Sequence, residues 1–123
     1  MIARSLNHVS FAVRDLTRSL AFYRDLLGLE TLPRPDFGFP GAWLGSGGAQ
    51  IHLIEVPADF DAGTPPPTLN PLGGHTAFAI DDYDGTLAAL RGRGLDVLAI
   101  ESSRQMWVKD PDGNVIELIA GTR

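Results

Sequence analysis

A turn and a strand share residues 110–119, which read DPDGNVIELI. Asp at the first position, Pro at the second and Gly at the fourth are the preferences of a type I turn over residues 110–113. In the strand that follows, side chains alternate between two faces, so Ile116 and Leu118 share one face and Glu117 lies on the other, between aliphatic residues. An ionised carboxylate in such surroundings costs several kcal/mol unless a cation or hydrogen-bond donors compensate it. Glu117 therefore needs a partner elsewhere in the chain.

The opening of the chain recurs in its second half. Residues 7–13 read NHVSFAV and residues 74–80 read GHTAFAI, so His8 and His75 lie at corresponding positions 67 residues apart. The strand at residues 116–119 corresponds in the same way to residues 51–54, at an offset of 65. A repeat of this length predicts one structural unit written twice.

Each half is predicted to be a βαβββ module. An alternating strand is followed by a helix with an aspartate N-cap, Asp15 or Asp82, and a glycine just after its end, Gly28 or Gly94. Three short strands separated by turn residues complete each module. Module one covers residues 5–56, an irregular proline-rich linker covers 57–72 and module two covers 73–121, within a single domain of residues 1–123.

The repeat places four potential metal ligands at equivalent positions: His8 and His75 on the first strands, His52 and Glu117 on the last strands. They include all three histidines of the chain. On the first strands the histidines share their face with small residues, which leave a cavity. A single histidine on a strand is more often a packed core residue, but packing alone does not explain four such side chains at matched positions. Nitrogen and oxygen ligands suit Zn, Ni, Co, Mn or Fe(II).

Composition excludes several other classes of function. The formal net charge is −5 and the only lysine is Lys109, so no basic stripe for nucleic acid is present. The chain has no cysteine, which excludes disulfides and thiolate ligands or nucleophiles. Neither the ~20 apolar residues of a membrane span nor the apolar core of a signal peptide is found. We expect a cytoplasmic protein with no nucleic-acid or membrane partner.

These residues resemble the vicinal oxygen chelate superfamily, which includes glyoxalase I, extradiol dioxygenases, methylmalonyl-CoA epimerase, fosfomycin-resistance enzymes and bleomycin-binding proteins. The resemblance runs from residues 6–9 (LNHV) through residues 18–29 (RSLAFYRDLLGL) to residues 110–118 (DPDGNVIEL). It implies an α+β fold in which two tandem βαβββ modules form an open, eight-stranded, barrel-like sheet with two helices packed outside. It also implies a divalent metal ion held by His8, His52, His75 and Glu117.

The resemblance further implies a glyoxalase-like lyase or isomerase. Such an enzyme would act on a small substrate with vicinal oxygens through a metal-stabilised enolate, with Glu117 as the catalytic base and glutathione as a candidate cosubstrate. His52 stands where glyoxalase I has a carboxylate and the epimerase a glutamine. Without His52, the set His8, His75 and Glu117 would be the two-histidine, one-carboxylate triad of an Fe(II) extradiol dioxygenase. A fosfomycin-type thiol transferase and a non-enzymatic drug-binding module are the remaining alternatives.

The resemblance also favours a homodimer. An open module must pair with another one, and we expect His8 and His52 of one subunit to share a site with His75 and Glu117 of the other. Aromatic and basic residues are candidates for substrate contacts, although each is more often packing or solvated surface: Phe37, Phe39, Trp43, Met106 and Trp107 for an apolar pocket, and Arg34, Arg104 and Lys109 for an anionic group.

Overall fold

The computed structural model describes residues 1–121; Thr122 and Arg123, which the predicted domain includes, lie outside the described residues. The chain divides into two units, residues 1–63 (unit 1) and the residues from Thr64 onward (unit 2). Each unit holds one four-stranded open sheet and one helical segment in the order βαβββ, which confirms the predicted α+β fold. Within residues 1–121 no helix is long and apolar enough to cross a membrane.

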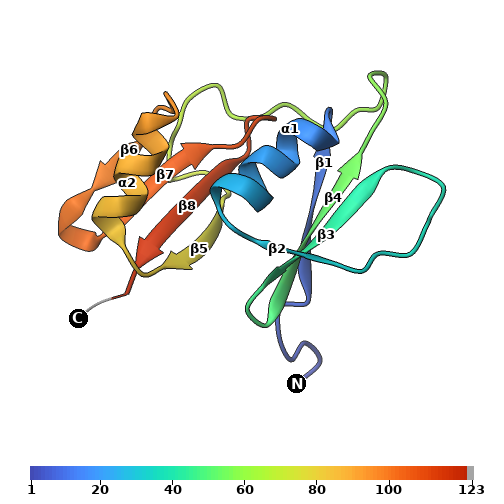
Figure 1. Ribbon diagram of the computed structural model, residues 1–123, viewed down its shortest axis with the longest axis horizontal. Coiled ribbons are helices and arrows are strands. Elements are labelled where there is room, and N and C mark those ends of the chain that lie inside the picture. The colour runs from blue at the N-terminus through green and yellow to red at the C-terminus, as the bar shows by residue number, and fades with distance from the viewer. Residues whose placement is uncertain (122–123) are drawn as a thin grey trace. The chain divides into compact units, whose positions relative to one another are not determined.

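Unit 1 is a four-stranded sheet with the order β1-β4-β3-β2 (Figure 1). The first and last strands of the module pair in parallel, and the other two pairs are antiparallel. A helical segment connects β1 to β2. The elements are β1 (His8–Val13), α1 (Leu16–Leu20), a π-helix η1 (Ala21–Leu26), β2 (Glu30–Leu32), β3 (Gly41–Ser46) and β4 (Ala49–Glu55).

Unit 2 repeats this topology with the strand order β5-β8-β7-β6. Again the first and last strands are parallel neighbours, and again the helix follows the first strand (Figure 1). The elements are β5 (Thr76–Ile80), α2 (Tyr83–Gly92), β6 (Leu98–Ile100), a 3₁₀ turn η2 (Glu101–Ser103), β7 (Gln105–Lys109) and β8 (Val115–Ala120).

Both helical segments begin and end as predicted. The Asp15 side chain accepts a hydrogen bond from Arg18 N at 3.2 Å, and Asp82 accepts one from Gly85 N at 2.9 Å. After the helices, Gly28 has φ +80° and Gly94 has φ +76°. A left-handed residue at this position closes a helix at little steric cost only when it is glycine.

The first helical segment differs from the regular α-helix that the spacing of its leucines predicts. From Ala21 the helix widens into a π-helix, in which Leu27 N donates to Phe22 O at 2.9 Å. This places the neighbouring residues Phe22 and Tyr23 both in the core, 6% and 0% exposed. Tyr23 stacks on Phe11 of β1 with ring centroids 5.5 Å apart, so the helical segment packs against the Phe11 face of the sheet.

In each unit the face that packs under the helix forms the hydrophobic core. In unit 2, Ile116 and Leu118 are 0% and 1% exposed and share their face with the buried Met106 and Val108. In unit 1 the same role falls to Leu44, Ile51 and Leu53. The predicted alternation is therefore confirmed, and the other face of each sheet is left for residues of a different kind.

The predicted turn at residues 110–113 is also confirmed. Gly113 N donates to Asp110 O at 3.0 Å. The Asp110 carboxylate, only 5% exposed, accepts from Asp112 N at 3.0 Å and from both Asn114 N and Asn114 Nδ2, at 2.8 and 2.9 Å. Hydrogen bonds to a charged group are among the stronger ones in proteins. This turn holds the start of β8, the strand that carries Glu117.

We expect Gly113→Ala to lower the free energy of unfolding by about 1–3 kcal/mol, because Gly113 has a left-handed φ of +88° and an added Cβ would lie 2.8 Å from Pro65 Cβ. Gly48→Ala is the control: Gly48 also follows a strand, has no positive φ and faces open space. Urea unfolding of both variants provides the measurement. Equal midpoints for the two variants would contradict the constraint at Gly113.

Candidate metal centre

In unit 1 the parallel pairing of β1 with β4 brings two histidines together. Ser10 pairs with His52, so His8, two residues before Ser10, lies on the same face as His52. This is the face opposite the helical segment. The two imidazole rings stack with centroids 4.0 Å apart and planes 14° from parallel.

Each histidine of unit 1 has one ring nitrogen held by an amide oxygen. His8 Nδ1 lies 2.7 Å from Asn7 Oδ1, and His52 Nε2 lies 2.9 Å from Gln50 Oε1. Because an amide oxygen only accepts, these ring nitrogens carry the hydrogens. His8 Nε2 and His52 Nδ1 keep their lone pairs, as metal ligation requires.

The surroundings of His52 favour its neutral form. Burial lowers the pKa of His52 below its ordinary value of 6.5, and the nearby His8 and Arg34 lower it further. Loss of hydration penalises the imidazolium, and a neighbouring cation repels it. Neutral imidazole is the form that binds metal ions.

In unit 2 the same register joins His75 and Glu117. Ala77 of β5 pairs with Glu117 of β8, and His75 precedes Ala77 by two residues. His75 Nε2 lies 2.9 Å from Glu117 Oε1. Glu117 is only 6% exposed. The buried carboxylate that the sequence predicts to need a partner has one.

Neighbouring groups orient both side chains of this pair. His75 Nδ1 donates to Gly73 O at 3.0 Å, which leaves Nε2 directed at Glu117. Gln105 Nε2 donates to Glu117 Oε2 at 3.1 Å, which leaves Oε1 directed at His75. Metal-ligating histidines and carboxylates in proteins are oriented by such outer hydrogen bonds. The outer hydrogen bonds therefore orient His75 Nε2 and Glu117 Oε1 in the way that metal ligands are oriented in other proteins.

The four predicted ligands thus form two pairs, His8 with His52 and His75 with Glu117. No third His, Asp or Glu side chain within residues 1–121 joins either pair. Imidazole nitrogens and one carboxylate fit a divalent ion of the first transition row. Two protein ligands alone do not make a structural or catalytic site of that kind, so neither pair is a complete site by itself.

Sequence reasoning missed the polar residues behind these pairs: Asn7, Gln50 and Gln105. Each of them lies beside or two residues from a residue on the site face. Gln50 precedes His52 by two positions, and Gln105 precedes Trp107, the register partner of Glu117, by two. Amides are common on strand surfaces, and nothing in their spacing alone marks a role.

Met106 and Trp107, both predicted to line an apolar pocket, lie on opposite faces of their sheet. Met106 is fully buried on the helix side of its sheet, where it pairs with Leu118, so it is a core residue. Trp107 is 4% exposed and pairs in register with Glu117 on the opposite face. Its ring lies edge-on to His75, with centroids 6.5 Å apart. Trp107 therefore forms part of the wall beside the second pair.

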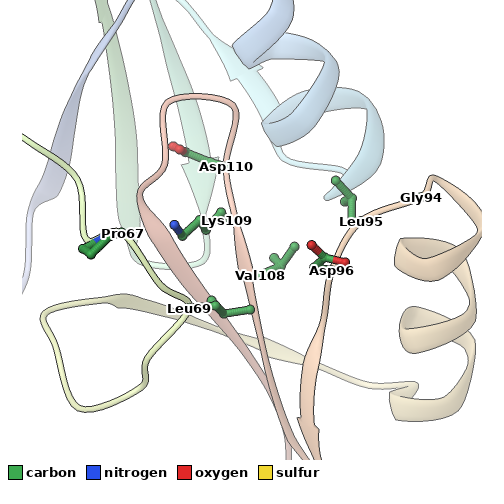
Figure 2. Close-up of a pocket in the computed structure, with 8 residues that line it drawn as sticks. All are labelled: Pro67, Leu69, Gly94, Leu95, Asp96, Val108, Lys109 and Asp110. Carbon is green, nitrogen blue, oxygen red and sulfur yellow. The ribbon is translucent and has the colours of Figure 1, made fainter.

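A hollow of about 440 Å³ in unit 2 is separate from the second pair (Figure 2). Val108 lines it and lies on the helix face of β7, whereas Trp107 and Glu117 lie on the other face. None of the four predicted ligands lines the hollow, which is formed by Pro67, Leu69, Gly94, Leu95, Asp96, Val108, Lys109 and Asp110.

The chain is similar to known proteins over nearly its whole length. Glyoxylase I 4 of Arabidopsis thaliana is 34% identical over 93% of this chain and 69% of its own length. Metallothiol transferase FosB of Staphylococcus epidermidis is 31% identical, over 96% of this chain and 82% of its own. The solved structure of TnmS3, an antibiotic binding protein from Streptomyces sp. CB03234, superposes with a TM-score of 0.69 at 28% identity, over 99% of both chains.

Family comparison covers nearly the whole chain. Residues 5–118 match the model of the Glyoxalase/Bleomycin resistance protein/Dioxygenase superfamily. The match includes all four predicted ligands and both βαβββ modules. The chain is a member of the Glyoxalase/Bleomycin resistance protein/Dioxygenase superfamily, the vicinal oxygen chelate proteins.

Proposed function

We propose that this chain is a divalent-metal-dependent, glyoxalase-like lyase or isomerase that acts on a small substrate with vicinal oxygens. The observation that carries the proposal is the matched pair of donor sets: His8 with His52 in unit 1, and His75 with Glu117 in unit 2. They occupy the same repeat positions, on the sheet face opposite the helix in both units. The match to relatives named as a glyoxylase and a metallothiol transferase supports enzyme chemistry at this site.

The four side chains would hold one ion together. The nitrogen donors would be His8 Nε2 and His52 Nδ1, which the surrounding hydrogen bonds leave open, and His75 Nε2. The oxygen donor would be Glu117 Oε1, which contacts His75 Nε2 in this structure. A bound divalent ion supplies Lewis-acid polarisation of the substrate oxygens.

Glu117 has a second role in this proposal, that of the base. Glu117 is only 6% exposed, and a carboxylate placed within hydrogen-bond reach of a substrate proton is a common general base in enzymes. It would accept the proton from the carbon beside the substrate carbonyl and return it to the neighbouring carbon, so the reaction consumes no proton. Gln105 would hold Oε2 throughout and so orient the carboxylate. Trp107 would limit access of water from its side.

An extradiol ring-cleaving dioxygenase is the second candidate. The observation that favours it is the stacking of the His52 ring on both His8 and Trp43, which limits the rotation that would direct Nδ1 toward an ion shared with His8. If His52 does not bind the ion, then His8, His75 and Glu117 remain as the two-histidine, one-carboxylate set of Fe(II) oxygenases. Glutathione is a candidate cosubstrate only if the chain is a glyoxalase-like lyase or isomerase.

We also propose that the working form is a homodimer. In it, His8 and His52 of one subunit would share a metal ion with His75 and Glu117 of the other. The support is chemical: each pair alone has two donors, and a divalent transition metal ion needs more. Symmetric pairing of two copies would complete two sites at once.

The metal proposal predicts about one divalent ion per chain in untagged protein, measured by elemental analysis. Substituting any of the four ligands by alanine should abolish stoichiometric binding. Gln105→Leu should weaken it about tenfold in chelator competition, because outer hydrogen bonds of this kind typically contribute that much. Ser10→Ala, on the same face of β1 but without a ligand role, is the control.

Metal-free wild-type protein that binds no added ion would refute the metal centre and leave the drug-binding alternative. Where metal binds, assays separate the reactions. We expect turnover of hemithioacetals, and neither oxygen uptake with catechols nor thiol addition to fosfomycin. Oxygen uptake that requires Fe(II) and persists in His52→Ala would instead support the dioxygenase.

In metal-free protein, we expect the His52 imidazole to titrate below pH 6.5, because burial, His8 and Arg34 all lower its pKa. Arg34→Met should raise the midpoint, and Arg4→Gln should not. Since the pKa is lower in the folded than in the unfolded chain, the unfolded chain binds the proton more readily, and acidification below 6.5 reduces stability. NMR of the ring protons gives the midpoint; a value at or above 6.5 would disprove these contacts.

Sharing of sites between subunits can be tested by mixing two inactive variants. Random exchange of His8→Ala and Glu117→Ala subunits gives heterodimers as half of all dimers, and each heterodimer holds one intact site of two. Metal binding and activity should therefore return to about a quarter of the wild-type level. Mixing His8→Ala with His52→Ala is the control and should restore nothing. Heterodimers that are demonstrably formed but metal-free would exclude shared sites.

A further inference from the structure

We infer that unit 1 carries a binding surface for a planar aryl group beside the proposed metal ligands. The substrate of this site would then be an aryl compound with two neighbouring oxygens at one end and an anionic group at the other. The link to the metal rests on the proposed function, whereas the aryl surface belongs to unit 1 alone. This surface is a series of five rings, here called the aromatic row: Phe39, Phe37, Trp43, His52 and His8.

The rings of the aromatic row follow one another without a gap. Phe39 stacks on Phe37 with centroids 5.8 Å apart, and Phe37 meets Trp43 at 6.0 Å and a tilt of 45°. Trp43 stacks on His52 at 4.5 Å and 10°, and His52 on His8 at 4.0 Å and 14°. The outer rings Phe37 and Phe39 are exposed, so a planar group would meet the row at this end.

Strand register holds the inner part of the row. Trp43 of β3 pairs directly with His52 of β4, and directly opposed residues in antiparallel strands share a face. Aromatic pairs at such positions add stability beyond the area that they bury. The pairing of β3 with β4 therefore holds Trp43 beside His52, independently of the loop between β2 and β3.

A tight turn positions the outer part of the row. Gly38 has φ +82°, and its N–H donates to Asp36 Oδ1 at 2.9 Å. This is an Asx-type turn, which glycine completes at no steric cost. It places Phe37 and Phe39 on either side of the turn with nearly parallel rings. The turn lies in the wide loop between β2 and β3 (Figure 1).

Arg34 supplies a fixed cation at the outer end. Its guanidinium carbon lies 5.0 Å from the centroid of the Phe37 ring and 5.1 Å from that of Phe39. Nη2 donates to Phe39 O at 3.2 Å. A Cβ on Gly41 would lie 2.8 Å from Nη2, so the guanidinium occupies space that only glycine leaves. The guanidinium has five N–H donors, and a planar anion suits them.

Exposure shows that the row is not core packing. The Phe37 side chain is 51% exposed and Phe39 is 45% exposed, while Leu44 and Leu53, on the other face of the same sheet, are fully buried. Large apolar rings left in water beside polar ligands are typical of binding sites. The exposed rings favour a planar aryl group, and the Arg34 guanidinium favours an anion. At the inner end, the metal ion that His8 and His52 would hold favours two neighbouring oxygens.

The aryl surface can be tested on the full-length chain without metal by isothermal titration calorimetry. The probe is 2-naphthoate. Decahydro-2-naphthoate has the same charge but no aromatic ring, and 2-naphthamide has the ring but no charge. We expect 2-naphthoate to bind at least fivefold more tightly than either. Equal affinity of the three probes, or no binding of 2-naphthoate, would overturn the inference.

Variants locate the binding to the row. Phe37→Leu should weaken 2-naphthoate binding about fivefold, in the range of aromatic stacking energies. Arg34→Met should weaken 2-naphthoate about fivefold and leave 2-naphthamide unchanged. Phe60→Leu is the matched control, because Phe60 is 49% exposed but lies outside the row. Equal loss in Phe60→Leu, or a Phe37→Leu variant that changes the oligomeric state and not the affinity, would refute an aryl site.

Titrations with Zn²⁺-loaded protein test this inference separately from the proposed function. The probe 6,7-dihydroxy-2-naphthoate carries neighbouring oxygens opposite its carboxylate. Its affinity should rise at least tenfold when the chain is loaded with Zn²⁺, and that of 2-naphthoate should not. If Zn²⁺ binds but neither probe responds to Phe37→Leu, the inference fails and the proposed function stands. If no Zn²⁺ binds, the proposed function fails, and the metal-free titrations still decide the aryl surface.

Discussion

Parallel pairing between the first and last strand of each module is the constraint on which the candidate site depends. The pairs Ser10 with His52 and Ala77 with Glu117 set which side chains share the face opposite the helix. A slip of one residue would turn every ligand into the helix-packed core and bring out the leucines and isoleucines that now fill it. The core therefore enforces the site: the free energy of burying Leu53 and Leu118 also holds the ligands on the open face.

Electrostatics distinguish the two modules, although their backbones repeat. Unit 1 offers two stacked imidazoles, and burial, His8 and Arg34 lower the pKa of His52. Unit 2 offers an imidazole and a buried carboxylate. The negative charge of the carboxylate requires compensation. In the structure, Gln105 donates a hydrogen bond to Glu117 Oε2, and His75 Nε2 lies 2.9 Å from Oε1. A divalent ion would take over the same role, with the same atoms facing it.

Much of this arrangement could be predicted from the sequence because it depends on periodicity. Alternation placed His8 and Glu117 on their faces, and the Asp-Pro-Asp-Gly signal identified the turn before β8. Gln105 could not be predicted, because its contact with Glu117 depends on a neighbouring strand whose register has no local signature. The aromatic row could not be assembled either, since Phe37 reaches Trp43 only through the geometry of the Gly38 turn.

The π-helix accounts for a difference in length between the two modules. His8 and His75 are 67 residues apart, but the glycines that close the helical segments, Gly28 and Gly94, are 66 apart, so module one has one more residue in between. An extra residue in a regular α-helix would rotate all that follows by about 100°. The wider turn from Ala21 to Leu26 absorbs it. One module can therefore hold an extra helical residue while the strands of the two modules keep the same register.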